Sequence, residues 1–126
     1  MKHIKTTLTY LLILAAGLGT GLVVANAPKW LKKPYVEGNY AAYYPNAQTK
    51  VVVYGTQSCP YCAKTREFLR AKNIAFADLD VQHSPKAQKE FEQLGGSGVP
   101  VVLIGNRRIQ GFNQDAFEAA LKTVTQ

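Results

Sequence analysis

Two cysteines, Cys59 and Cys62, are the side chains of this sequence best suited to covalent chemistry, and no other cysteine occurs in its 126 residues. A disulfide between them would close a very short loop, so it would remove little chain entropy and stabilise the fold only weakly. A structural zinc site needs four nitrogen or sulfur ligands, and the only histidines available to complete one are His3 and His83. Thiol–disulfide redox chemistry is the interpretation that remains.

The residues around the cysteines predict that the pair lies at the start of a helix. Residues 51–54, Val-Val-Val-Tyr, are typical of a buried strand, and residues 55–58 then form a turn. Pro60 suits the first turn of a helix, where its missing N–H costs nothing. Backbone N–H groups and the helix dipole stabilise an anion there, so we expect the Cys59 sulfur to ionise more readily than a free thiol. Since a thiolate attacks in disulfide exchange, Cys59 is predicted to be the nucleophile and the more enclosed Cys62 the resolving thiol.

A second candidate for the site is the pair Val99 and Pro100 at the start of a predicted strand. Proline is tolerated at this position because it gives up only an edge hydrogen bond. With a cis peptide bond, the turn could lie against Cys59 and offer the Val99 backbone to an extended substrate strand. Tyr61, between the cysteines, either tunes the site or only covers the surface, and the sequence leaves both interpretations open.

The remaining elements predict an α/β domain. Residues 74–81 read as a second strand, and Ser84 followed by Pro85 opens a helix that ends near residue 94. Residues 99–110 predict a hairpin with a tight turn at its centre, and Asn113 can cap a final helix over residues 114–124. The order β-α-β-α-β-β-α implies a four-stranded mixed sheet flanked by helices, which is the thioredoxin-like plan.

The N-terminal part of the chain has a different composition. Residues 8–24 are apolar and uncharged, and extended to residue 27 they give about 20 residues, enough to cross a bilayer as a helix. A cleaved signal peptide is the alternative, since residues 25–27 are Ala-Asn-Ala, but Pro28 follows directly and should obstruct cleavage. We therefore predict a transmembrane signal-anchor over residues 1–27, a Pro/Tyr-rich stem over residues 28–49, and the redox domain over residues 50–126.

This organisation predicts a single-pass membrane protein whose domain lies on the periplasmic rather than the cytoplasmic side, because a signal-like first helix usually leaves its C-terminal part outside. The formal net charge is +7, but residues 1–49, with five lysines against one glutamate, hold +4 of it, which leaves +3 for the other 77 residues. Because this basic excess flanks the apolar segment and does not cluster on the domain, we expect no nucleic-acid partner.

The predicted domain resembles the glutaredoxin family over roughly residues 50–122. Residues 51–69, VVVYGTQSCPYCAKTREFL, are similar to the family's strand, CPYC motif and first helix. Residues 98–112, GVPVVLIGNRRIQGF, are similar to its cis-proline strand, hairpin and glycine turn. The resemblance implies a thioredoxin-like fold, Pro100 as the cis-proline, and thiol–disulfide exchange. It also implies glutathione as the reductant or as the group removed from protein mixed disulfides.

The resemblance further implies where a glutathione substrate would bind. Family members often carry a lysine three residues before the first cysteine, and Thr56 stands at that position here. Arg107 or Arg108 could supply a charge in its place, or could simply be solvated residues of the hairpin. The predicted substrate-binding residues are Tyr61, Val99, Gly111, Phe112 and Asn113.

The sequence therefore predicts a membrane-tethered, monomeric thiol–disulfide oxidoreductase of glutaredoxin type with no bound cofactor or metal. Its expected partners are a disulfide-containing protein or a glutathione mixed disulfide. The alternative is an iron–sulfur scaffold in which two chains each contribute Cys59 and one glutathione thiolate. By the family pattern Pro60 disfavours this alternative, because it stiffens the turn between the cysteines.

Overall fold

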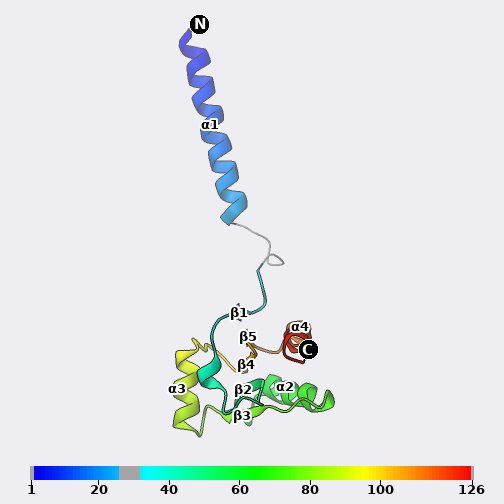
Figure 1. The fold of residues 1–126 in the computed structure, drawn as a ribbon. Coiled ribbons are helices and arrows are strands. Elements are labelled where there is room, and N and C mark those ends of the chain that lie inside the picture. The colour runs from blue at the N-terminus through cyan, green and yellow to red at the C-terminus, as the bar shows by residue number, and fades with distance from the viewer. Residues whose placement is uncertain (1, 26–31, 126) are drawn as a thin grey trace. The chain divides into compact units, whose positions relative to one another are not determined.

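The chain is described by a computed structural model that covers residues 2–25 and 32–125, without the side chains of residues 2 and 19–25. It divides into two compact units, Met1–Lys33 and Pro34–Gln126. The first contains the helix α1 (Lys2–Ala25), and the second contains all the strands and the other helices (Figure 1). Residues 25–27, where the alternative of a cleaved signal peptide would place the cleavage site, and the start of the stem lie largely outside the described residues.

The helix α1 does not support the predicted membrane anchor. Among the described residues, no helix is both long enough and apolar enough to cross a bilayer. The described side chains of α1 begin with polar groups such as His3, Lys5 and Thr7, and the later part of the predicted apolar run, residues 19–24, has no described side chains. The predictions of a single-pass membrane protein and of a membrane-tethered periplasmic domain are therefore contradicted.

The second unit is built on a five-stranded mixed sheet with the strand order β1-β5-β4-β2-β3. The four predicted strands are all present, as β2 (Val51–Gly55), β3 (Ala77–Asp80), β4 (Val101–Ile104) and β5 (Arg107–Gln110). Strand β2 is parallel to β3 and antiparallel to β4, which in turn is antiparallel to β5. The predicted thioredoxin-like fold class is confirmed.

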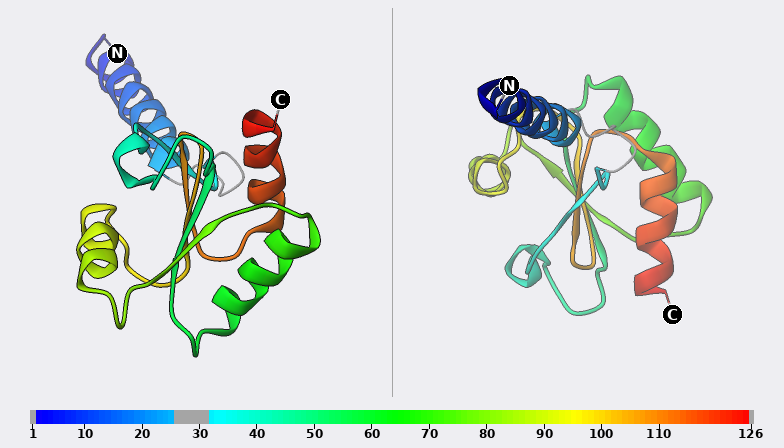
Figure 2. Two further views of the ribbon diagram at one scale, coloured as in Figure 1. Left: turned by 60° about the horizontal axis from the view of Figure 1, so that its bottom comes forward. Right: turned by 90° about the horizontal axis from the view of Figure 1, so that it is seen from above.

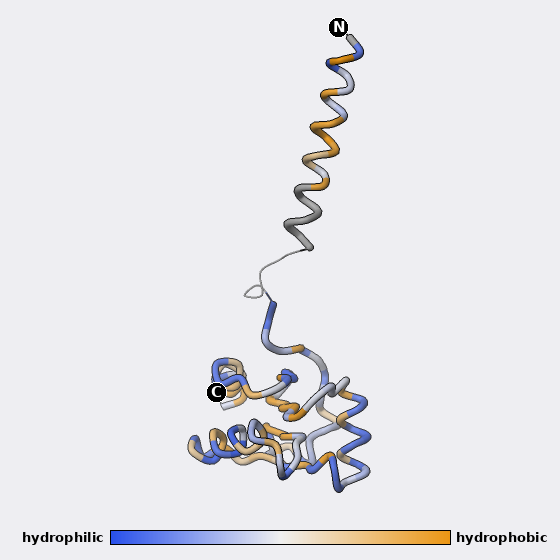
Figure 3. Tube along the Cα trace, turned by 180° about the vertical axis from the view of Figure 1, so that it is seen from behind, coloured by the Kyte–Doolittle hydropathy of each residue, from blue (hydrophilic) through white to orange (hydrophobic). Residues whose placement is uncertain are grey.

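Helices cover both faces of this sheet. The helices α2 (Pro60–Ala71) and α4 (Gln114–Val124) lie on one face and α3 (Pro85–Gln93) on the other (Figure 2). Successive strand residues point to opposite faces, so Val51 and Val53 pack with α2 and α4, while Val52 and Tyr54 pack with α3. Figure 3 shows hydrophobic residues along the strands of this unit and a mixture of hydrophobic and hydrophilic residues in its helices.

The helix starts follow their predicted caps. The Ser84 hydroxyl accepts the backbone N–H of Ala87 at the start of α3, and the Asn113 side chain accepts that of Ala116 at the start of α4. Such caps satisfy N–H groups that have no partner inside the helix. Local sequence signals are therefore sufficient to place these two helices.

Part of the predicted stem belongs to the folded unit. A two-residue strand, β1 (Val36–Glu37), pairs antiparallel with β5, and a short 3₁₀ helix, η2 (Ala41–Tyr43), follows. The Tyr44 hydroxyl donates to the Gly105 carbonyl in the β4–β5 turn, at 2.9 Å. The rings of Tyr40, Tyr43 and Tyr44 pack on the face that α3 covers, so the segment after Pro34 completes the core on that side.

Candidate active site

Cys59 occupies the N-cap position of α2. Its backbone is extended, with φ −84° and ψ 118°, and Pro60 is the first residue of the helix. The Cys59 Sγ accepts a hydrogen bond from the backbone N–H of Cys62, with an N-to-Sγ distance of 3.2 Å. It also lies 3.8 Å from the Val99 carbonyl oxygen. Both predicted parts of the site, the cysteine motif and the Val99–Pro100 turn, therefore meet at this sulfur.

Cys62 is in a different environment from Cys59. Its side chain is fully buried, whereas that of Cys59 is partly exposed. Burial, followed by the hydrogen bond with Cys59, raises the pKa of the Cys62 thiol to about 11, although a backbone contact with Thr56 and the charge of Arg66 act in the opposite direction. Near neutral pH, Cys62 is therefore a protonated thiol.

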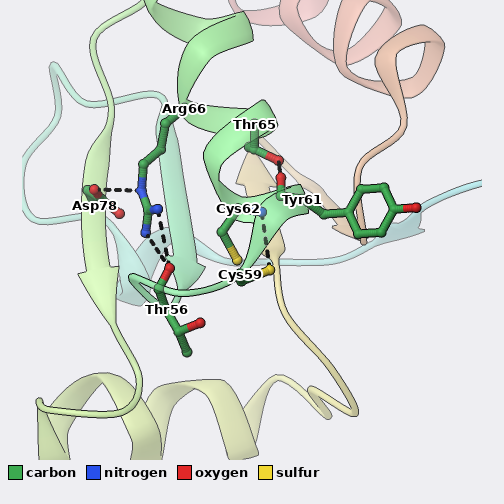
Figure 4. A network of polar contacts seen from close by, with 7 residues as sticks. All are labelled: Thr56, Cys59, Tyr61, Cys62, Thr65, Arg66 and Asp78. Atoms are coloured by element: carbon green, nitrogen blue, oxygen red, sulfur yellow. Dashed lines mark hydrogen bonds and ion pairs between the residues drawn. The ribbon is translucent and has the colours of Figure 1, made fainter.

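A guanidinium network holds the loop that precedes Cys59 (Figure 4). The Arg66 Nε donates to Asp78 Oδ2 at 2.9 Å, and both Nη atoms lie 3.3 Å from the Thr56 carbonyl oxygen. Asp78 is on β3, Arg66 on α2, and Thr56 directly follows β2. Sequence reasoning missed this network, although Arg66 lies four residues after Cys62 and therefore on the same helix face, which is a signal that could have indicated it.

Gly55 and Thr65 allow α2, the helix that contains Cys62, to pack closely against the sheet. At Gly55 an added Cβ would lie 2.9 Å from the Cys62 Sγ, so only glycine leaves room for that sulfur. The fully buried Thr65 donates its hydroxyl to the Tyr61 carbonyl at 2.8 Å, which satisfies a polar group in the core. Neither residue was singled out from the sequence.

The turn that faces Cys59 is held by the end of β5. The Val99–Pro100 peptide bond is cis. The backbone N–H of Gly111 donates to the Pro100 carbonyl at 2.8 Å, and the side-chain amide of Gln110 donates to the Gly98 carbonyl. Gln110 was not predicted to contribute here, because a single glutamine at a strand end carries no local signal.

The predicted substrate-binding residues divide into two groups. Tyr61 is 57% exposed, and Figure 4 shows its ring extending outward from α2 beside the cysteines. In contrast, the Phe112 ring packs edge-on against Phe117 with centroids 5.6 Å apart, and the Asn113 side chain caps α4. The Gly111 N–H is already bonded to Pro100, so it is not free for the predicted contact with glutathione.

Arg107 lies away from the cysteines. It is the first residue of β5 and pairs with Ile104, whereas Gln110 is at the other end of the strand and pairs with Val101. Its guanidinium carbon lies 4.2 Å from the centroid of the Tyr35 ring, and its Nε is 4.0 Å from a Glu37 carboxylate oxygen. The suggestion that Arg107 supplies charge to the site is therefore not supported.

Comparisons with known proteins agree with this geometry. The family model for glutaredoxin matches residues 51–109. An uncharacterised glutaredoxin-like 8.6 kDa protein in the rubredoxin operon of Clostridium pasteurianum is 43% identical over 65 residues, which are 51% of this chain and 87% of that protein. The glutaredoxin of Pseudomonas aeruginosa is 32% identical over 62 residues, which are 48% of this chain and 74% of that protein.

The crystal structure of a glutaredoxin from Archaeoglobus fulgidus has a TM-score of 0.54 and 24% identity, and the match covers 68% of this chain and 96% of that one. At this identity it supports the fold alone. The likeness to the Clostridium protein goes further, because at 43% identity it extends over most of that protein's length. The chain therefore belongs to the glutaredoxin family.

Proposed function

We propose that this chain is a thiol–disulfide oxidoreductase in which Cys59 attacks the substrate and Cys62 resolves the mixed disulfide. The observation that carries the proposal is the difference between the two sulfurs. Cys59 is partly exposed, and its sulfur accepts the backbone N–H of Cys62 at the start of α2. Cys62 is buried, and its pKa of about 11 keeps it protonated near pH 7. A substrate disulfide can therefore reach Cys59 first.

In the first step the Cys59 thiolate attacks one sulfur of the substrate disulfide. A Cys59–substrate S–S bond forms, the substrate S–S bond breaks, and the departing thiolate takes up a proton. Cys62 then loses its proton and attacks the Cys59 sulfur, which releases the second substrate thiol and leaves a Cys59–Cys62 disulfide. The substrate gains two electrons and the chain loses two, so an external thiol reductant must restore the dithiol.

The environment of Cys62 supports its role in the second step. The Arg66 charge and the backbone contact with Thr56 both lower the pKa of Cys62 against the larger effect of burial. Once Cys59 forms a mixed disulfide, its hydrogen bond no longer raises the Cys62 pKa. A larger fraction of Cys62 is then thiolate in the step in which Cys62 attacks. Glutathione and a protein disulfide are the two substrate classes that family membership makes reasonable.

The proposal is tested with the full chain and insulin as the disulfide substrate, with dithiothreitol as reductant. Cys59→Ser should abolish turnover, whereas reduced Cys62→Ser, mixed with insulin after dithiothreitol has been removed, should accumulate a mixed disulfide on Cys59 that mass spectrometry detects. Ser58→Ala, which removes a hydroxyl next to the nucleophile, serves as the control and should keep the turnover. Activity that survives Cys59→Ser, or a mixed disulfide found first on Cys62, would refute the assignment.

A further inference from the structure

We propose that Thr65 is a positioning residue for Cys59, because its buried hydroxyl orients and polarises the peptide group that donates a hydrogen bond to the Cys59 sulfur. This inference rests on the proposed function and adds a residue to the same reaction. The Thr65 hydroxyl acts on the sulfur only through the peptide group that joins Tyr61 to Cys62. Figure 4 shows the two hydrogen bonds of this group as dashed lines.

One planar peptide group carries both hydrogen bonds. The Thr65 Oγ1 donates to the Tyr61 carbonyl oxygen at 2.8 Å. The N–H of the same group, which belongs to Cys62, donates to the Cys59 Sγ with an N-to-Sγ distance of 3.2 Å. In a trans peptide the carbonyl and the N–H point in opposite directions. The two bonds therefore form a relay along the first turn of α2, from the core toward the nucleophile.

The Tyr61 carbonyl has a hydrogen-bond donor without this hydroxyl. It lies within α2, where each carbonyl accepts the backbone N–H of the residue four positions on. Thr65 is the one polar or charged residue that is buried in the described part of the chain. Valine has the same branched shape and would fill the position without a polar group. The hydroxyl therefore supplies something other than packing or a partner for the backbone.

The hydroxyl strengthens the N–H that faces the sulfur. Hydrogen bonds in a chain polarise one another, and the effect is larger where water is excluded. A donor on the carbonyl oxygen draws electron density from the peptide nitrogen, which makes its N–H a better donor. The thiolate is the attacking form of cysteine, and hydrogen bonds to an ionised acceptor are roughly twice as strong as those between neutral groups. The Thr65 hydroxyl therefore favours the attacking form of Cys59.

The Cys59 sulfur depends on this single donor. Among the residues that the structure describes, the Cys62 N–H is the only group that donates a hydrogen bond to it. Its other polar neighbour, the Val99 carbonyl oxygen at 3.8 Å, presents the negative end of a dipole. The titratable and charged side chains that α2 and β3 bring to this region stay unchanged in the variants below; they are Tyr61, Cys62, Lys64, Arg66, Asp78 and Asp80.

Three substitutions of Thr65 separate the hydroxyl from the packing. Thr65→Ser keeps the hydroxyl and loses the methyl group, Thr65→Val keeps the branched shape and loses the hydroxyl, and Thr65→Ala loses both. Thr123→Val is the matched control, because the Thr123 hydroxyl also donates to a helix carbonyl, that of Ala120 on α4. Thermal unfolding checks that each variant folds as the parent does.

Two measurements on the reduced full chain report the relay. The first is the NMR chemical shift of the Cys62 amide proton, which moves upfield when the N–H donates more weakly. The second is the rate at which iodoacetamide alkylates Cys59 as a function of pH, with the label located by mass spectrometry. In Thr65→Val and Thr65→Ala the amide proton should move upfield, and the pH of half-maximal alkylation should rise by about 0.3 unit, a two-fold change in the reactive fraction. Thr65→Ser and Thr123→Val should match the parent in both measurements.

The inference is overturned if the pH of half-maximal alkylation is unchanged in folded Thr65→Val or Thr65→Ala. It is also overturned if Thr65→Ser changes as much as Thr65→Ala, since the effect would then follow the methyl group, or if Thr123→Val changes equally. These outcomes are distinct from failure of the proposed function. If iodoacetamide labels Cys62 before Cys59, the assignment of the nucleophile fails. If Cys59 is labelled first with the same profile in every variant, that assignment stands and the role of Thr65 is refuted.

Discussion

Replacing Arg66 with methionine removes the guanidinium that ties the loop before Cys59 to the edge strand, and it keeps most of the buried aliphatic length. The bond to Asp78, 2.9 Å long, joins two charges, and hydrogen bonds of this kind contribute roughly 1.5–3 kcal/mol. Asp78 is 40% exposed, so water can replace part of the lost contact. The Thr56 carbonyl loses two longer contacts of 3.3 Å. We therefore expect a loss of roughly 2 kcal/mol in the free energy of unfolding.

This loss should appear as a decrease in Tm of about 10 °C for a domain of this size, measured by circular dichroism of the reduced protein. The variant should also resolve mixed disulfides more slowly. Arg66 lowers the pKa of Cys62, so its removal raises that pKa further and reduces the fraction of attacking thiolate. Rapid quenching of the Cys59 mixed disulfide and separation of the products give the rate of this step.

Arg66→Lys and Asp78→Asn are the matched controls. Arg66→Lys keeps the positive charge but not the fork of donors, so it should lose most of the stability and keep more of the resolving rate. Asp78→Asn removes the negative charge but keeps an oxygen acceptor, and should cost less stability than Arg66→Met. A stability of Arg66→Met within 0.5 kcal/mol of wild type, or an unchanged resolving rate, would refute the reasoning.

Three further predictions concern the packing of the site and the stem. The pKa of Cys62 in the folded protein, about 11, lies above its usual value of 9.0. The free energy of unfolding should therefore be highest below pH 9 and fall as the pH rises through 11. Urea titrations at each pH measure this fall, and Cys62→Ala should reduce it. Gly55→Ala should lower Tm through overpacking of roughly 1–3 kcal/mol against the Cys62 sulfur, whereas Gly98→Ala, whose added Cβ meets nothing closer than 3.9 Å, should change it far less. Tyr44→Phe should cost about 1 kcal/mol, through loss of its hydrogen bond to the β4–β5 turn.

Each of these has a result that contradicts it. Stability that rises between pH 9 and 11 would mean that the Cys62 thiolate is favoured in the folded state. Equal Tm values for Gly55→Ala and Gly98→Ala would show that α2 can move away from an added Cβ at residue 55 without loss of stability. An unchanged urea midpoint for Tyr44→Phe would show that the stem does not stabilise the domain.

The elements with strong local signals were predictable from the sequence. The β-branched run at residues 51–54 marked a buried strand, and Ser84 and Asn113 marked helix starts. The position of Cys59 at the start of α2 followed from Pro60 and the turn before it. In each case a few neighbouring residues determine the local conformation, so no knowledge of the tertiary fold was needed.

Features that depend on pairing across the sheet were not predictable. Arg66 and Asp78 are 12 residues apart in the chain, and they meet only because β3 pairs with β2 in the register Val53↔Asp78. The strand β1 is two residues long and has no period of its own, and its partner β5 determines its conformation. The anchor prediction was wrong for the opposite reason, because it relied on local apolar composition alone.

The pairing of β1 with β5 has a consequence for the chain's behaviour at high concentration. An open strand edge is a template on which another molecule can build, and natural proteins cover or charge such edges to avoid aggregation. Here residues 36–38 pair with the β4–β5 hairpin and cover the edge of β5. At the other edge of the sheet, the strand β3 carries the carboxylates of Asp78 and Asp80. A shortened chain that begins at residue 50 would expose β5, and we expect it to self-associate where the full chain stays dispersed.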